Sequence, residues 1–405
     1  MNVKFSVLFT VATLMLLLIC SASIQAKEVT HAKEVDVVAT QQKEQPKSAY
    51  ANQSKTWQIH CARGQSISWA LSLARPGDTI RVIGSCHDVV VIDKDKITLE
   101  GVAGANIDGS NISADAVVLV DGARNIVIRD LSIINGMDQG VLIQRQAQVK
   151  LTNLSLTNHL TVALSVDGSN IEIENLTMTN NSGGGMDAYS ASTVLARGQV
   201  NASDNGGDGI AVNGKTFLEL RGGTITANQN QGSGVSVIND SRLQIFSFPE
   251  AQGSRITADS NGFAGIALLG GELGVVGSQY FGSGANEINA NYNVFGFFMP
   301  SGGIFSPHAT AKFIATNNFT GMLIEDGGSS LIVGGLNISQ NVQGIAAAGA
   351  GTLNFVSVPP NPSTVDTNQL DLNFSFGSRV TLDGVTASSI VCDPTVMMRG
   401  SLACP

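Results

Sequence analysis

Residues 163–212 read ALSVDGSNIEIENLTMTNNSGGGMDAYSASTVLARGQVNASDNGGDGIAV, and this stretch decides the fold. It holds three copies of one short pattern, a small residue followed by apolar residues one and three positions later, starting at Ala163, Gly185 and Gly209. Further copies start at Gly140, Gly234, Gly265, Gly296, Gly321 and Gly344. The steps between the nine anchors are 23, 22, 24, 25, 31, 31, 25 and 23 residues. Such a period is typical of solenoids.

Each copy has the period of a strand with one buried face, because its apolar residues alternate with unconstrained ones such as Ser165, Asp187 and Ser236. A second apolar run follows in each step, for example VKLTNLSL from Val149. Asn, Gly and Ser separate the runs, and the repeats show no helical period. Strands stacked coil on coil pair in parallel. The sequence therefore predicts an all-β protein, a single-stranded parallel β-helix.

A short helix is expected before the first coil. In GQSISWALSLARPGDTIRVIG, from Gly64, apolar residues recur at helical spacing from Ile67 to Ala74, with Trp69 among them, and Pro76-Gly77 ends the helix. Such a cap would cover the open end of the core. The runs VVVIDKDKITLEG and AVVLVDGARNIVIRDLSIING would then form the first coils.

This order of helix, PGDTI, ITLEG and repeated Asn-flanked apolar runs resembles the right-handed parallel β-helix superfamily, also called pectin-lyase-like, over about Trp57 to Gly384. The resemblance implies a right-handed coil and a polysaccharide partner. It implies no single reaction, because members include lyases, hydrolases, esterases, epimerases, tailspikes and adhesins. The chain has no GHG, DPHD or WxDH motif like those of the polygalacturonases, alginate epimerases and pectate lyases.

The amino-terminal residues predict export. Residues 1–26 have a Lys near the start, an apolar run and SASIQA, which together are typical of a signal peptide. Residues 27–56 would be a flexible polar lead, 57–390 the β-helix with its cap, and 391–405 a disulfide-closed tail. A secreted or periplasmic protein is expected. Cys20 leaves a lipid anchor at the outer surface as an alternative, against which the bulky Ile19 argues. No other apolar run is long enough to span a membrane.

Four cysteines remain after such a cleavage. Cys61 and Cys86 flank the expected helix, and Cys392 and Cys404 lie in the tail. An even number in an exported protein favours two local disulfides, one at each end. Metal binding is the alternative, but the spacings fit no zinc pattern.

Repeated asparagines precede the anchors by four residues. They are Asn181, Asn205, Asn230, Asn261 and Asn317, and His159 takes this place in the second coil. Stacked side chains at about 4.8 Å can form an amide ladder that satisfies turn backbone groups. The pattern favours this structural role over a functional one.

Candidate catalytic residues lie in the middle coils. Asp187 takes an outward position at which other copies carry mostly small residues, and Asp167 and Tyr189 should stack beside it. About 8 Å would separate the backbones of Asp167 and Asp187, within the range of inverting glycosidase carboxylates. Arg145 lies diagonally beyond Asp167, and Asp208 sits before the next anchor. Each residue alone also has a structural explanation, as a turn residue or as a cover for the core edge.

Aromatic residues suggest a substrate-binding surface. The two long steps contain loops at 246–255 and 277–286, and we expect Tyr280, Phe281, Tyr292 and Phe298, together with Asp208, to contact a sugar polymer. The alternative is that these rings pack the loops onto the coil.

Two functions remain open. The first is a polysaccharide lyase or glycoside hydrolase: Asp167 and Asp187 would serve hydrolysis, whereas in a lyase Tyr189 would abstract a proton from a uronate neutralised by Arg145. The second is a non-catalytic surface or matrix protein that binds glycans. We expect either no cofactor or Ca²⁺, and a monomer. The net charge of −9 and the absence of a basic run exclude tight nucleic-acid binding.

Overall fold

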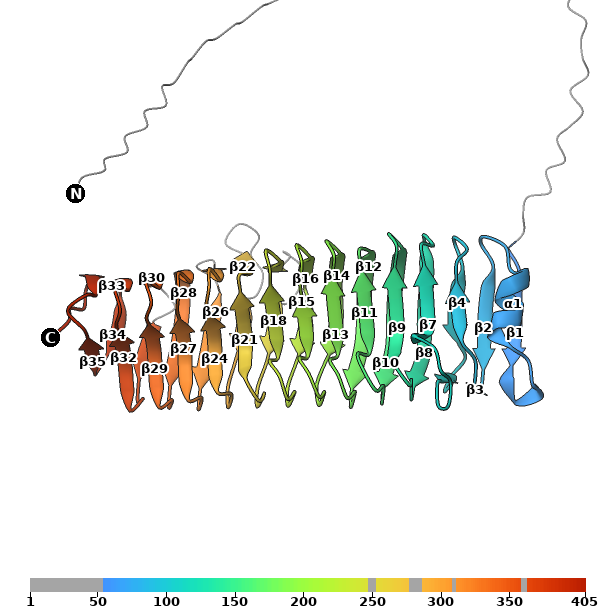
Figure 1. The fold of residues 1–405 in the computed structure, drawn as a ribbon, viewed down its shortest axis with the longest axis horizontal. Coiled ribbons are helices and arrows are strands. Elements are labelled where there is room, and N and C mark those ends of the chain that lie inside the picture. Colours follow the sequence, from blue (N-terminus) through green and yellow to red (C-terminus); the bar gives the residue numbers. More distant parts are fainter. Residues whose placement is uncertain (1–53, 247–252, 277–285, 308–310, 358–362) are drawn as a thin grey trace, which may run out of the picture. The chain divides into compact units, whose positions relative to one another are not determined.

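The computed structural model of the protein describes residues 54–246, 253–276, 286–307, 311–357 and 363–405. These residues form stacked parallel coils closed at one end by a short helix (Figure 1). One side of every coil contributes a strand to a 13-stranded sheet, called sheet B below. Its strands are β4 (Val90–Ile92), β7 (Ala116–Asp121), β9 (Gln139–Gln144), β11 (Leu164–Asp167), β13 (Met186–Tyr189), β15 (Ile210–Val212), β18 (Val235–Ile238), β21 (Ala264–Leu269), β24 (Phe295–Met299), β27 (Thr320–Ile324), β29 (Gln343–Ala347), β32 (Leu370–Phe374) and β35 (Ile390–Cys392).

The rest of each coil belongs to a 23-stranded sheet, called sheet A. A coil contributes to it either one long strand or two shorter ones. Its strands are β1 (Thr56–His60), β2 (Thr79–Ile83), β3 (Ser85–Cys86), β5 (Thr98–Gly101), β6 (Asn106–Asp108), β8 (Ile126–Ile134), β10 (Gln148–Thr157), β12 (Asn170–Thr179), β14 (Thr193–Asn201), β16 (Phe217–Arg221), β17 (Thr224–Thr226), β19 (Arg242–Phe246), β20 (Arg255–Thr257), β22 (Glu272–Val276), β23 (Glu287–Asn289), β25 (Ile304–Pro307), β26 (Lys312–Thr316), β28 (Ser329–Ser339), β30 (Thr352–Ser357), β31 (Ser363–Asp366), β33 (Arg379–Asp383), β34 (Val385–Ala387) and β36 (Met397–Gly400).

The nine anchors mark successive coils, as predicted, from β9 to β29. They are small because the backbone of the next coil passes beside them. A Cβ on Gly185 would lie 2.5 Å from the carbonyl oxygen of Gly209, and one on Gly209 would lie 2.6 Å from that of Gly234. The apolar residues after each anchor point inward and form one continuous core. The expected first coils are also present, as β4 and β7 with the strands that follow them.

The predicted register of the middle coils is confirmed. Asp167 pairs with Tyr189, and the next coil places Asn213 beside them, its N–H donating to the carbonyl of Ala188 at 2.9 Å. All three side chains are partly exposed. Val166, Ala188 and Val212, one residue earlier in each strand, are fully buried. The two sets therefore lie on opposite faces of sheet B.

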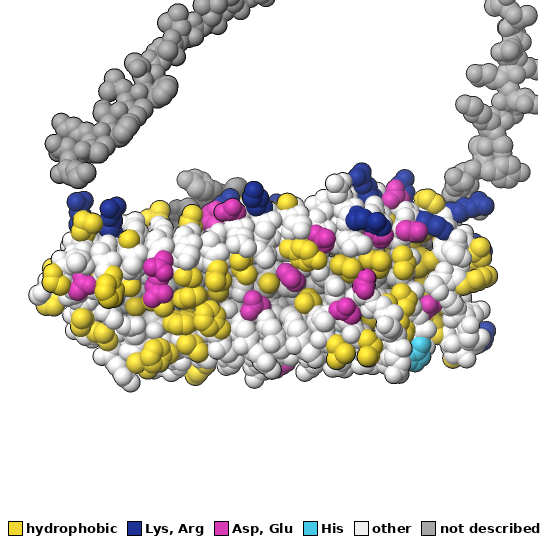
Figure 2. Space-filling model, viewed as in Figure 1, with side chains coloured by type: hydrophobic (Ala, Val, Ile, Leu, Met, Phe, Trp, Pro, Cys, Tyr) yellow, Lys and Arg dark blue, Asp and Glu magenta, His cyan; other side chains and the backbone are white. Residues whose placement is uncertain are grey.

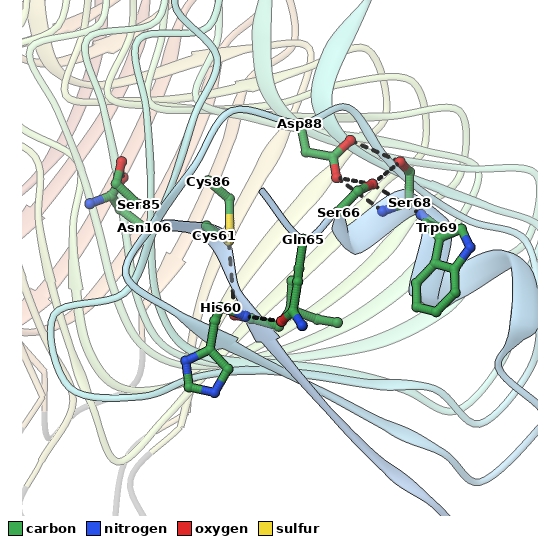
Figure 3. Close-up of a disulfide and its surroundings, with 11 residues drawn as sticks. His60, Cys61, Gln65, Ser66, Ser68, Trp69, Ser85, Cys86, Asp88 and Asn106 are labelled. Atoms are coloured by element: carbon green, nitrogen blue, oxygen red, sulfur yellow. Dashed lines mark hydrogen bonds between the residues drawn. A yellow bond between two sulfur atoms is a disulfide. The ribbon is translucent and has the colours of Figure 1, made fainter. Parts of the chain in front are cut away.

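The cap is helix α1 (Ile67–Leu73) after a 3₁₀ turn, η1 (Cys61–Arg63), and the Cys61–Cys86 disulfide fastens this region to the first coil (Figure 3). Its N-cap, Ser66, accepts from the Trp69 N–H at 3.1 Å. Asp88 accepts from the Ser68 N–H at 3.0 Å and from the Ser66 hydroxyl at 2.8 Å. Trp69 departs from the helical pattern: it is 59% exposed and meets Trp57 edge-on instead of entering the core.

The second predicted disulfide is also confirmed. Cys392 in β35 is bonded to Cys404, with 5.7 Å between the Cα atoms. Strands β35 and β36 continue the two sheets into residues 391–400. Closing such a loop stabilises a fold by about 3 kcal/mol in the chain-entropy account, and here it acts at the end of the stack, where solenoids fray.

An asparagine ladder runs along the turn before sheet B, as expected, but it changes register in the later coils. Asn181, Asn205, Asn230 and Asn261 are followed by Asn293 and Asn318, not by Asn317. Asn318 lies three residues before its anchor because this turn is one residue shorter. Asn317 is exposed with φ 58°, so its side chain lies outside the ladder. Asn341, Asn368 and Asp371 complete the series.

His159 begins the ladder and makes the same two contacts as the asparagines. Its Nδ1 accepts from the Gly136 N–H at 3.0 Å, and its Nε2 lies 3.1 Å from the Ile133 carbonyl oxygen, to which it can donate. The ring is therefore neutral. Burial lowers its pKa to about 4, because protonation would charge an inaccessible ring and remove the acceptor for Gly136.

We expect His159 to make the fold sensitive to acid. An unfolded chain takes up this proton near pH 6.5, whereas the folded protein resists it until about pH 4. Stability is therefore lost as the pH falls from about 6.5 to 4, by about 3 kcal/mol in total. His159→Asn can keep both hydrogen bonds, and its unfolding free energy should lack this part of the pH dependence. Urea unfolding at several pH values measures the free energy of unfolding of both proteins. An equal dependence of this free energy on pH in the two proteins would contradict the expectation.

Candidate functional site

Asp187 lies at the centre of the outward face of sheet B. Its lateral neighbours are Ser165 in β11 and Ala211 in β15, and Ser236 follows in β18. Short side chains on both flanks leave the carboxyl half-buried without covering it. The alternation of β13 places Asp187 outward because Met186 and Ala188 fill the core.

Asp208 is the charge that acts on Asp187. Burial raises the pKa of the Asp187 carboxyl above its usual range, and the negative charge of Asp208 raises it further. Asp208 lies in the turn before β15, where its Oδ1 accepts from the Ser233 N–H at 2.7 Å. The site therefore combines a carboxyl whose pKa is raised with a second carboxyl close enough to act on it.

Glycines in the turns let successive coils pack closely around these two acids. A Cβ on Gly232 would lie 2.2 Å from Oδ1 of Asp208, so only glycine leaves room for that carboxylate. Gly183 and Gly206 pack against the backbones of Thr161 and Ser182, where a Cβ would come within 2.7 and 2.1 Å. The turns beside the acids are therefore packed closely, coil on coil. The pattern SGGG, GGDG and GSG in successive coils is the sequence signal for this close packing.

Asp167 and Tyr189 lie beside the acids, as predicted. They face each other across β11 and β13. The Ser165 hydroxyl lies 3.5 Å from the Tyr189 hydroxyl, so that Tyr189 leans back toward the central column. The tyrosine can thus contact a ligand that lies over Asp187.

Arg145 does not join this group in the way we expected. It follows β9 with a φ of 59°, and its guanidinium forms an ion pair with Asp121 of the preceding coil. The left-handed backbone turns the side chain away from the direction of the strand. The expected diagonal approach to Asp167 is therefore replaced by a contact with Asp121.

The predicted aromatic residues fall in three places. Phe298 lies in the central outward column and stacks on Phe295 with 4.9 Å between ring centroids, and Phe263 meets both rings edge-on. Tyr292 is exposed in the ladder turn. Tyr280 and Phe281 lie outside the described residues, as does most of both long loops. Sequence reasoning missed Phe263 and also Phe319, which is exposed in the turn before β27.

Two surface hollows lie on sheet A and not at this site. One, of about 350 Å³, follows the bend at Asp130, Asn153 and Asn175, and another, of about 470 Å³, includes Lys150 and Glu172. The first arises because left-handed residues bend the long strands there. We place the candidate site on sheet B because the paired acids lie there, and concavity alone indicates no chemistry.

No metal centre is evident in the part of the chain that the structure describes: no three His, Cys, Asp or Glu side chains gather as ligands would. Within the same residues, no helix has the length and apolar character needed to cross a bilayer.

The coil geometry agrees with the comparisons. The model of the right-handed β-helix region matches residues 115–279, from just before β7 past the end of β22. Over these residues the chain matches that family, and the described coils have a parallel β-helix fold. None of the curated proteins matches this β-helix protein.

Solved structures similar to this β-helix include the A-module of mannuronan C-5 epimerase AlgE6 from Azotobacter vinelandii, at 15% identity over 83% of this chain and 93% of that one, with a TM-score of 0.41. An alginate lyase from Paenibacillus sp. has 11% identity over 86% and 98%, with a TM-score of 0.40. Pectate lyase Pel9A has 13% identity over 85% and 78%, with a TM-score of 0.36. Similarity this low says nothing about the activity of this β-helix.

Proposed function

We propose that this protein is an exported glycoside hydrolase that cleaves a polysaccharide on the outward face of sheet B. The observation that carries the proposal is the position of Asp187, half-buried between small residues, with Asp208 raising its pKa. A protonated carboxyl beside an ionised one is the arrangement that glycoside hydrolysis needs.

Each residue has a role in this reaction. Asp187 donates its proton to the glycosidic oxygen, so that the leaving sugar departs as an alcohol. Asp208 accepts a proton from the water that attacks the anomeric carbon, and the hydrogen bond from the Ser233 N–H holds its carboxyl in place. Asp167 and Tyr189, on the same face, contact the sugar bound over Asp187. Because Arg145 is paired with Asp121, a lyase reaction on a uronate has less support.

The two disulfides support the export part of the proposal. Cys61–Cys86 and Cys392–Cys404 pair four cysteines of the described residues. Such bonds persist in oxidising compartments, as expected for a protein secreted or released into a periplasm. The predicted signal peptide, residues 1–26, and Cys20 lie outside the described residues.

A second function, glycan binding without catalysis, is favoured by the aromatic cluster. Phe263, Phe295 and Phe298 form a partly exposed surface two to three coils beyond Asp208, and aromatic faces suit the apolar faces of sugar rings. Glycan binding to this surface requires neither Asp187 nor Asp208. The same face would then hold a polymer at a cell surface or in a matrix.

Incubation with a panel of polysaccharides separates these functions. We expect new reducing ends on at least one polymer and no absorbance from unsaturated sugars, because hydrolysis creates no double bond. Unsaturated products would identify a lyase instead. Binding to a polymer that stays intact would support the non-catalytic function.

A further inference from the structure

The two sheets differ sharply in the positive charge that they carry. Among the described strands, those of sheet B contain no Lys or Arg. Sheet A contains Arg81, Arg129, Lys150, Arg197, Arg221, Arg242, Arg255, Lys312, Arg379 and Arg399. In Figure 2 the Lys and Arg side chains gather along one long edge of the body, and the middle of the visible face carries acidic and hydrophobic groups.

Sheet B carries acidic side chains on its strands and in the turns beside them. Asp121, Asp167 and Asp187 are partly exposed on strands β7, β11 and β13, and Asp138 and Asp208 lie in the turns that lead into β9 and β15. Strands only about 4.8 Å apart bring these carboxylates close enough to add their potentials. Asp121 is offset by its ion pair with Arg145, and Asp187 serves as the proton donor in the proposed reaction. The negative charge near Asp187 therefore rests on Asp138, Asp167 and Asp208.

The Lys and Arg side chains nearest to this face lie in the turns that follow the strands of sheet B. Two of them already have partners within the protein. Arg145 is paired with Asp121. Lys94 donates to the carbonyl oxygens of Leu71 and Ser72 at 2.8 Å each. Lys96, Arg124 and Lys215 are at the border toward sheet A, past the last outward residue of their coils. A carboxylate bound over Asp187 would thus meet Asp side chains first.

The part of sheet B beyond the acids is apolar. Phe298 and Leu323 pair across β24 and β27 in the central outward column, and the exposed Val294 and Phe319 flank them in the preceding turns. A glycan that extends from Asp187 along the stack would reach this surface. This surface can pack against the apolar faces of sugar rings and adds no preference for either sign of charge.

We propose that sheet B selects glycans by charge: it binds polymers of amino sugars most tightly, neutral glycans less tightly and polyuronates least. The selection rests on the proposed function, since it describes the ligand of the same face. Its physical cause is the group of carboxyl side chains at Asp138, Asp167 and Asp208 on a sheet whose described strands carry no Lys or Arg, which attracts ammonium groups and repels carboxylates.

Direct binding measurements test this order. Oligosaccharides of equal length are titrated into the full protein by calorimetry: glucosamine oligomers, N-acetylglucosamine oligomers, cello-oligomers and oligogalacturonates, the last with and without added Ca²⁺. We expect affinity to fall by about tenfold or more from the amino sugars to the oligogalacturonates. Added salt should weaken the binding of the amino sugars. Oligogalacturonates that bind as tightly as the neutral sugars, in either condition, would overturn the inference and leave the polysaccharide function intact.

A pair of matched variants locates the selection on sheet B. Asp121→Asn removes one carboxylate and releases Arg145 from its ion pair, so the difference between amino sugars and oligogalacturonates should shrink. Glu174→Gln removes a carboxylate that pairs with Lys150 at 3.4 Å on sheet A, and the order should stay as in the parent. Equal effects of the two variants would place the selection elsewhere. Binding of no glycan at all would contradict the proposed function itself.

Discussion

Replacing Asp187 with Asn is expected to lower turnover of the polysaccharide by about 10²- to 10⁴-fold, the usual contribution of a general acid. The melting temperature at neutral pH should not fall. Burial and Asp208 raise the pKa of Asp187, which means that the ionised carboxylate is unfavourable in the folded state, and an amide removes that cost. Initial rates and thermal unfolding of the purified variant measure both effects. Parent-level turnover would exclude Asp187 as the acid and favour the binding protein.

Asp208→Asn is the companion variant. It removes the negative charge that raises the pKa of Asp187, so that pKa should fall toward its ordinary value. An NMR titration of carboxyl carbons measures this without activity. An unchanged Asp187 titration would show that the two carboxyls do not interact.

The largest loss of stability is expected from Asn318→Ala. The Asn318 side chain accepts from the Asn293 N–H at 2.8 Å and donates to the Ala290 carbonyl oxygen at 3.0 Å. Alanine would leave these groups buried without partners, at a cost of about 2–5 kcal/mol in total. Denaturant unfolding measures the change in the free energy of unfolding.

Asn317→Gly is the matched control for the ladder. Residue 317 is exposed and has a φ of 58°, a conformation that glycine adopts without strain. We expect a change below about 1 kcal/mol. If Asn317→Gly lowered the free energy of unfolding more than Asn318→Ala does, the ladder would pass through Asn317, as expected from the sequence, and not through Asn318.

Much of the fold could be predicted because a parallel β-helix is close to a one-dimensional structure. Each strand pairs with the equivalent strand one period later, so the spacing of Gly185, Gly209 and Gly234 specifies which residues stack. The alternation within each strand then specifies which side faces solvent. For this reason the positions of Asp167, Asp187 and Tyr189 on one face follow from periodicity. The cap and the terminal disulfides are predicted from other signals, the helical spacing before Pro76-Gly77 and the even number of cysteines.

The tertiary structure alone decided what happens at the turns. A turn one residue shorter moves the ladder from Asn317 to Asn318, yet it leaves the apolar spacing unaltered. The left-handed backbone at Arg145 directs this side chain to Asp121, and the turn before β15 brings Asp208 close enough to act on Asp187. Strand periodicity constrains residues that repeat along the stack, whereas side chains at corners are placed by backbone angles and turn lengths that a repeat pattern does not encode.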